Sequence, residues 1–324
     1  EREDATLGPT SFLAQISPAP DKTGFAAIRE TVGVPSEITY RRGRETPWQA
    51  LTDFNQAVAA ELRSHPEVRP IAWTGADGLA IEGLLLLPRE RGSTPLPMVV
   101  DVHGGPTWSV KHAFNPGFAL PLAAAGFAVF LPNYRGNVGW GQAYAKLNVG
   151  DPGGAEFEDI LRGIDWCVAA GIADPDRLGI TGASYGGYLT AWAVATTRRF
   201  KAAVMVSGIA NQWSCHYSCN HAFGDYIVGG PMAEEAPRRL AIERSPLMRL
   251  AGATTPTLIL HGREDRCTPL GQAQELYSAL VEQGAAAELV VYPREGHGLQ
   301  ERAHRRDAWR RTVGWFNRYL RPGA

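Results

Sequence analysis

The sequence predicts an α/β protein: a mostly parallel central sheet with helices on both faces, preceded by an N-terminal arm. Two observations support this class. Short apolar runs alternate with helix-length amphipathic segments over most of the chain, and a glycine-flanked serine, Ser184, stands where one such run meets a helix. A chain of 324 residues with 44% hydrophobic residues also has ample material for a substantial core.

Residues 1–68 are predicted to form an arm or linker, because proline and glycine interrupt their short apolar stretches. One helix is expected there, around Trp48 to Leu62. The second region, 69–324, opens with a β-hairpin in which residues 71–73 and 79–87 flank a turn at Asp77-Gly78.

The strands and helices that follow are predicted from their periodicity. The expected strands are residues 98–102, 127–131, 178–182, 202–206, 257–260 and 289–292. The expected helices carry apolar residues at positions 157–164, 273–281 and 309–320, and Gly284 is expected to end the second of them. Residues 211–250 break this rhythm and are the candidate for a lid over the sheet.

Composition excludes several classes of function. The formal net charge of −1 provides no field that would attract nucleic acid or an anionic membrane. The longest aliphatic run, Leu84 to Leu87, is far shorter than the roughly 20 apolar residues of a membrane-spanning helix. Four scattered cysteines make a poor disulfide framework, so we expect a cytoplasmic protein that partners neither nucleic acid nor membrane. The first residue is Glu1, so the chain is either processed or part of a longer product.

The motif Gly182-Ala183-Ser184-Tyr185-Gly186 lies at a predicted strand-to-helix junction, the context that a nucleophilic serine requires. Small flanking residues allow the tight turn that lifts the hydroxyl above the sheet, and the Tyr185 N–H at the start of the helix is placed to bind an oxyanion. Glycine-rich chains also contain this motif by chance, so the serine needs partners elsewhere in the sequence.

A serine hydroxyl requires a base and an orienting carboxylate, which in this architecture follow in the order Ser, Asp, His. Asp265 comes just after the strand 257–260, and His297 follows the last strand between two glycines. Glu264 is a competing carboxylate. His103 and His261 are competing bases, but both precede glycine directly at a strand end, which suggests structural roles. The three residues together predict a serine hydrolase of the α/β-hydrolase fold.

The loop His103-Gly104-Gly105-Pro106 follows an early strand and is expected to supply a second oxyanion donor. Gly105 is the preferred donor and Gly104 the alternative, because glycine lets the backbone turn an N–H toward the nucleophile.

Several motifs together resemble the catalytic domain of the prolyl oligopeptidase family, and its acylaminoacyl peptidase and dipeptidyl aminopeptidase branch in particular. They are residues 103–106, 133–136, 182–188, 261–265 and 295–298, and the resemblance covers residues 69 to 322. It implies a triad of Ser184, Asp265 and His297, with the Gly105 and Tyr185 amides as the oxyanion hole. The family also has an N-terminal β-propeller, which the arm is too short to build; the arm resembles the end of a last blade, through Gly33 to Tyr40, with a linker.

Substrate contacts are expected from the aromatic residues Trp213, Tyr217 and Phe223 and from Arg135, which could pair with a substrate carboxylate. Lid packing and structural ion pairing are the alternative roles. The cluster of cysteines and histidines at residues 215–221 lacks the second ligand set of a zinc site, so no metal or cofactor is expected.

Three functions remain open from sequence. They are a peptidase acting on short or N-acylated peptides, a carboxylesterase with the same triad, and a non-catalytic binding module. The expected partner is a small peptide or acyl-ester substrate; a homo-oligomer and association with a propeller domain are both open.

Overall fold

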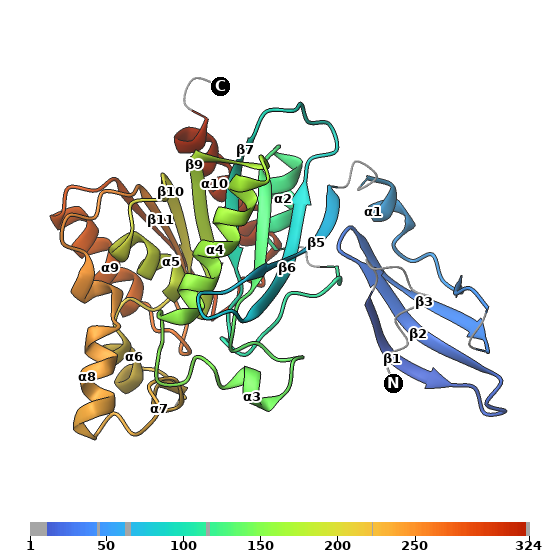
Figure 1. Ribbon diagram of the computed structural model, residues 1–324, viewed down its shortest axis with the longest axis horizontal. Helices are drawn as coiled ribbons and strands as arrows, with labels where there is room; N and C mark the ends of the chain where they lie inside the picture. Colours follow the sequence, from blue (N-terminus) through green and yellow to red (C-terminus); the bar gives the residue numbers. More distant parts are fainter. Residues whose placement is uncertain (1–11, 44–45, 62–65, 115–116, 222, 322–324) are drawn as a thin grey trace.

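The computed structural model describes residues 12–43, 46–61, 66–114, 117–221 and 223–321 (Figure 1). These residues form a four-stranded N-terminal sheet and an eight-stranded sheet of order β12-β11-β10-β9-β7-β8-β6-β5. The strands of the larger sheet are β5 (Glu67–Thr74), β6 (Ala80–Leu87), β7 (Leu96–Val102), β8 (Ala128–Asn133), β9 (Ala173–Ala183), β10 (Ala202–Val206), β11 (Thr257–Gly262) and β12 (Ala287–Tyr292).

Six neighbouring strands, β12 through β8, pair in parallel, whereas β6 is antiparallel to both β8 and β5. The predicted hairpin is confirmed as β5 and β6, and the six predicted strands correspond to β7 through β12. The parallel strands are apolar over nearly their whole length because helices cover both faces of the sheet.

Two separate apolar cores lie on the two faces of the sheet, beneath the helices that Figure 1 shows on either side of it. One face is covered by α4 (Ala155–Ala169), α5 (Tyr185–Thr196) and α9 (Gly271–Glu282), and the other by α2 (Ala119–Ala124) and α10 (Arg302–Leu320). We call the first the α5 face and the second the α10 face. The helices expected around residues 157–164, 273–281 and 309–320 are therefore present.

The segment expected to form a lid lies between β10 and β11. It contains α6 (Gln212–Ser218), α7 (Phe223–Ile227), α8 (Glu235–Glu243) and a 3₁₀ helix (Pro246–Arg249), which Figure 1 shows beyond one end of the sheet. A short helix, α3 (Gln142–Ala145), follows β8.

The N-terminal region is more regular than predicted. The strands β1 (Phe12–Pro18), β2 (Gly24–Thr31), β3 (Val34–Arg42) and β4 (Gln49–Ala50) form an antiparallel sheet, drawn to one side in Figure 1. The helix predicted from Trp48 to Leu62 is wrong in its first half, because Gln49–Ala50 pairs with β3 and α1 spans only Gln56–Glu61. Residues 1–11 of the predicted arm, Leu62 and the end of the second region at 322–324 lie outside the described residues.

The N-terminal sheet contacts the main domain through the turn between β2 and β3. Val32 in this turn is 6% exposed and belongs to the apolar core of the α10 face. The two parts of the chain therefore share one core at this point.

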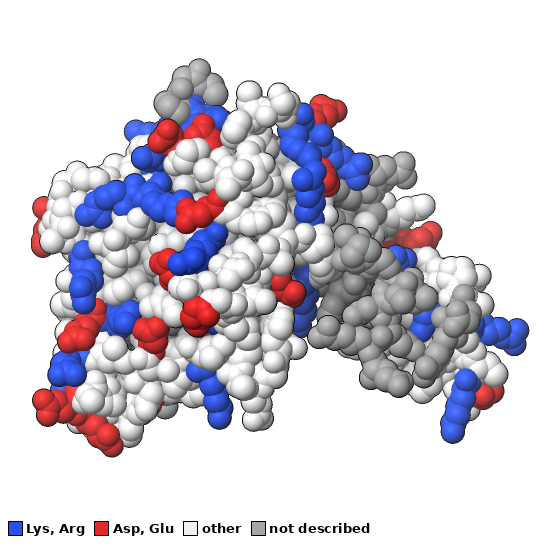
Figure 2. All heavy atoms as spheres, viewed as in Figure 1, with Lys and Arg blue, Asp and Glu red and all other residues white. Residues whose placement is uncertain are grey.

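Basic and acidic side chains are interspersed on the face of the molecule seen in Figure 2. Among the described residues, no helix combines the length and apolar character that crossing a bilayer requires.

Candidate active site

Ser184 occupies the turn between β9 and α5, with a backbone φ of 60°. This left-handed conformation is costly for a residue other than glycine, and it is typical of strained turns at functional sites. A Cβ at Gly186 would lie 1.9 Å from the Val102 carbonyl oxygen, and one at Gly182 would lie 2.5 Å from Gly186. Both glycines of the motif are therefore required for the turn to pack against β7.

Three side chains from separate loops form a continuous chain of contacts. His297, in the loop after β12, has Nε2 2.9 Å from Ser184 Oγ and Nδ1 2.9 Å from Asp265 Oδ2. Because an ionised carboxylate can only accept, Nδ1 carries the proton, and Nε2 is left to accept from the serine hydroxyl. The three predicted residues are thus brought together in the order that general-base catalysis needs.

Asp265 is held as an ionised acceptor. Its Oδ1 accepts from the backbone N–H groups of Cys267 and Thr268, and its Oδ2 accepts from Thr268 Oγ1 as well as from His297. Burial acts to raise the pKa of Asp265, but the hydrogen bonds from His297 and Thr268 outweigh it and keep this pKa below its usual value. Glu264 is exposed and Asp265 is buried, so Asp265 is the carboxylate that reaches the histidine.

The electrostatics of His297 match this arrangement. The hydrogen bond to Asp265 is the largest influence and raises the pKa of His297, with a smaller contribution from the Cys267 thiol, while burial opposes both. The paired carboxylate therefore stabilises the protonated form of His297.

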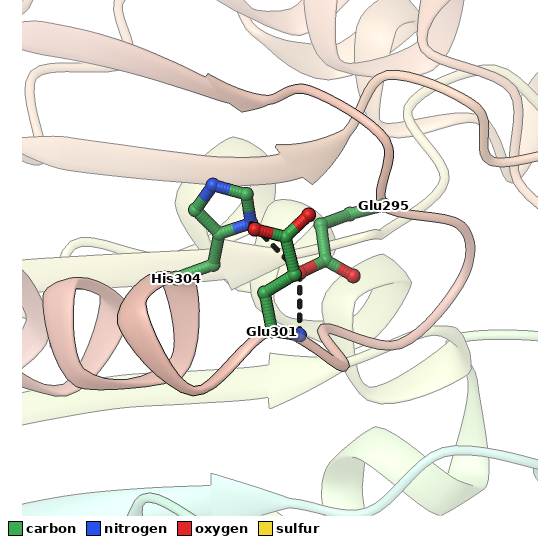
Figure 3. A group of neighbouring side chains, drawn as sticks. All are labelled: Glu295, Glu301 and His304. Carbon is green, nitrogen blue, oxygen red and sulfur yellow. Dashed lines mark hydrogen bonds and ion pairs between the residues drawn. The ribbon is translucent and has the colours of Figure 1, made fainter.

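The His297 loop is anchored by Glu295, whose carboxylate caps the start of α10 (Figure 3). Glu295 accepts from the backbone N–H groups of Gln300 and Glu301, at 2.7 and 2.9 Å, and from His304 Nδ1 at 2.8 Å. Glu295, Glu301 and His304 have the side-chain types of a metal site. However, both Glu295 oxygens are already engaged in capping, which explains the cluster without an ion.

The loop that carries Gly104 and Gly105 packs directly against the nucleophile. A Cβ at Gly104 would lie 2.8 Å from the Ala183 carbonyl oxygen and 3.1 Å from Ser184 Cβ, and Gly105 has a φ of 114°. Tyr185 is the first residue of α5, so its N–H has no acceptor within the helix. The Gly104 residue of this loop and the first residue of α5 thus both adjoin Ser184, and the predicted donor Gly105 is next in the chain after Gly104.

His103 secures this loop rather than acting as a base. Its ring stacks on Tyr134 with centroids 4.3 Å apart, Nδ1 contacts the Gly104 carbonyl oxygen at 2.7 Å, and the Asn137 amide donates to Nε2 at 2.8 Å. Burial lowers the pKa of His103 to about 4, so the ring is neutral near pH 7. His261 is buried against the Thr268 carbonyl oxygen.

The three predicted aromatic residues lie on α6 and α7. The Trp213 and Tyr217 rings are 4.8 Å apart, and Phe223 packs against the core of the α5 face. The segment joining these helices leans on the Asp265 loop, since Asn220 N donates to the Arg266 carbonyl oxygen at 2.8 Å. The segment between α6 and α7 is therefore tied to the loop that carries Asp265.

Arg135 was expected to contact a substrate carboxylate, but the structure pairs it with two carboxylates of the protein itself. Arg135 is 5% exposed, and its guanidinium donates to Asp159 at 2.7 and 2.8 Å and to Asp77 at 2.9 Å through two nitrogens. Four of its five N–H groups bond to these two carboxylates, so Arg135 has a structural role that ties the β5–β6 turn to α4.

Comparison with known proteins fits this geometry. Residues 114–323 match the prolyl oligopeptidase family. The chain belongs to that family. It is 35% identical over 319 residues to an uncharacterized peptidase, YuxL, of Bacillus subtilis, covering 95% of this chain and 47% of that one. It is 28% identical to the acylamino-acid-releasing enzyme of Arabidopsis thaliana over 69% of this chain and 30% of the relative.

Solved structures of the family have the same fold. Acylaminoacyl peptidase of Pyrococcus horikoshii superposes with a TM-score of 0.87 at 26% identity, over 97% of this chain and 50% of that one. A puromycin-hydrolyzing peptidase of Mycobacterium tuberculosis superposes with a TM-score of 0.83, also at 26% identity, over 98% and 48% of the two chains. The chain spans about half the length of these relatives, and that half is the catalytic part.

One supporting residue of this family member was missed by sequence analysis. Glu156 is fully buried and accepts from the Tyr185 hydroxyl at 2.6 Å, from the Gly153 N–H at 2.8 Å and from the Asn148 amide at 2.8 Å. Burial raises the pKa of Glu156 to about 7, and these three donors oppose that rise. Glu156 fixes the side chain of the residue next to Ser184, but its position on an ordinary amphipathic helix gave no signal of this contact.

Proposed function

We propose that this chain is a serine peptidase domain that cleaves peptide or acyl-amino-acid bonds through an acyl-enzyme formed on Ser184. The observation that carries the proposal is the pair of 2.9 Å contacts linking Ser184, His297 and Asp265. Membership of a family whose named relatives include acylamino-acid-releasing enzymes supports the acyl-amino-acid substrate.

In the proposed reaction, Ser184 Oγ attacks the scissile carbonyl carbon while His297 Nε2 takes the hydroxyl proton. The Gly105 and Tyr185 N–H groups stabilise the resulting oxyanion. The tetrahedral intermediate collapses, and the amine leaves with the proton from His297. Water then attacks the acyl-enzyme by the same route, releasing the acid and restoring Ser184.

The test uses an N-acetyl amino-acid p-nitroanilide with the wild-type chain and with Ser184→Ala. The variant should lose at least about 10⁴-fold in kcat/KM, because the histidine then has no nucleophile to activate. Turnover at comparable rates by the two proteins would refute the role of Ser184. A fluorophosphonate probe should label the wild-type chain and not the variant.

Carboxylesterase activity is the second candidate, because the same three residues can hydrolyse an ester, whose alkoxide leaves more easily than an amine. A p-nitrophenyl ester and a p-nitroanilide with the same acyl group separate the two functions. Turnover of the ester alone would leave only the esterase.

Two further proposals concern organisation and location. The antiparallel sheet β1–β4 has the strand number of a propeller blade, so we propose that it is part of one, and that residues 211–250 act as a lid. All four cysteines are unpaired, which supports a cytoplasmic location. Cell fractionation with an antibody to the chain would test that location.

A further inference from the structure

A cavity of about 510 Å³ lies between the Gly104 loop, α2 and strands β6 and β8. Its wall is mainly apolar, with side chains from the N-terminal turn, from the larger sheet and from the segment before α2, including Val32, Leu84, Leu86, Val110, Phe118 and Leu131. Pockets of roughly 300–1,000 Å³ with such walls and a few polar groups are typical of small-molecule sites.

Asp101 is the acidic group in this wall. It is the second-last residue of β7, and the alternation of Val100 and Val102 into the core of the α5 face turns Asp101 toward the α10 face. Among the described residues, none donates a hydrogen bond to its carboxylate or pairs with it. Its enclosure without a partner raises the pKa of Asp101 to about 7. Asp101 is partly buried, and a carboxylate that faces an apolar cavity without a protein partner can pair with a cation supplied by a ligand.

The other polar groups of the wall do not supply that cation. His103 is neutral near pH 7, and Ser109 carries no charge. Lys111 is exposed, and its ammonium lies 5.6 Å from the centroid of the exposed Trp108 ring, which places it at the rim.

The cavity adjoins the nucleophile. Gly104 and Ala183 both line it, and both border Ser184. Its apolar wall belongs to the core of the α10 face, against which Leu299, two residues after His297, also packs. Trp213 on α6 and Phe223 on α7 pack against the core of the opposite face. Because the histidine gives its proton to the leaving amine, the leaving group lies on the histidine's side of the scissile bond.

We propose that this cavity is the leaving-group pocket of the enzyme, and that Asp101 pairs there with the lysine or arginine side chain of the residue following the scissile bond. The apolar wall accommodates the methylene stem, and the carboxylate meets the charged end. This proposal rests on the proposed peptidase function.

The experiment compares two N-acetylphenylalanyl dipeptide amides that differ in their second residue, lysine or the uncharged, similarly shaped norleucine. Wild-type kcat/KM should favour lysine by about 10- to 100-fold, the range expected for a hydrogen bond between charged groups. Asp101→Asn should reduce this ratio to near one. Asp176→Asn is the matched control, because Asp176 is an exposed carboxylate near the opposite end of β9, and it should keep the wild-type ratio.

The p-nitrophenyl ester of N-acetylphenylalanine separates failure of the pocket from failure of the function. If the wild-type chain hydrolyses the ester and both peptides but shows no preference for lysine, the pocket proposal is overturned and the peptidase stands. If the ester and both peptides all resist hydrolysis, the proposed function itself fails. A preference for lysine that persists in Asp101→Asn would also overturn the role of Asp101.

Discussion

Replacing Asp101 with asparagine should stabilise the fold, and the gain should grow with pH. The pKa of this carboxyl rises from 3.8 to about 7 on folding, because the native site disfavours its charge. As pH increases from 3.8 to 7, the unfolded chain releases this proton before the native protein does, so native stability falls across that window. At 1.36 kcal/mol per pKa unit, the loss amounts to about 4 kcal/mol above pH 8 and to less than half of that at pH 5.

Urea unfolding of the two proteins at pH 5 and pH 8.5 measures this effect. Asparagine cannot ionise, so the variant does not lose stability as the pH rises. The free energy of unfolding of Asp101→Asn minus that of wild type should therefore be about 2.5 kcal/mol larger at pH 8.5 than at pH 5. The cost of leaving the neutral amide unpaired is the same at both pH values and cancels, as does the titration of His103. An equal difference at the two pH values would show that Asp101 ionises normally, and would remove one support of the leaving-group pocket.

Three further changes test the site. Asp265→Asn should lower kcat and should move the acidic limb of the pH profile of kcat/KM to lower pH, because the carboxylate that raises the pKa of His297 is gone. A profile whose acidic limb stays at the wild-type pH would contradict this. Tyr185→Phe should lower the free energy of unfolding by roughly 1.5–3 kcal/mol, because Glu156 loses a charge-assisted hydrogen-bond donor. Urea unfolding of the variant and of wild type measures this difference, and equal free energies would show that the hydrogen bond does not stabilise the fold. Gly186→Ala should abolish soluble, active protein, because its Cβ would lie 1.9 Å from the Val102 carbonyl oxygen. The control is Gly314→Ala in α10, whose Cβ meets nothing within 4 Å; it should leave activity intact and stabilise the helix by up to about 1 kcal/mol. Equal yields and activities of the two variants would contradict the packing argument.

The parallel part of the sheet was predictable because its strands are buried on both faces and therefore appear as continuous apolar runs. The strand β10 matches its predicted range, β7, β9, β11 and β12 extend theirs, and β8 is shifted toward the C-terminus of its range. The N-terminal strands give a weaker signal. In β2 most positions are only partly buried, and its pairing with β3 changes register near Arg29, so no clean alternation marks it as a strand.

The candidate site also contains residues that could be predicted from the sequence and residues whose roles could not. Ser184, Asp265 and His297 could be found because each follows a strand in an order that this architecture imposes. The sequence could not show that Arg135 is occupied by Asp77 and Asp159, since those partners are 58 and 24 residues away. It also could not show that Asp101 lacks a partner, because absence of a neighbour is a property of the packed structure alone.

The contribution of Val32 to the cavity wall has a practical consequence for anyone who trims this protein. A shortened chain beginning at β5 would keep every residue of the proposed triad. However, one side of the cavity and part of the core beneath α2 would be exposed to solvent. Such a fragment should bind its substrates with lower affinity and should aggregate through the exposed apolar surface. The β2–β3 turn therefore belongs in any minimal version of the enzyme.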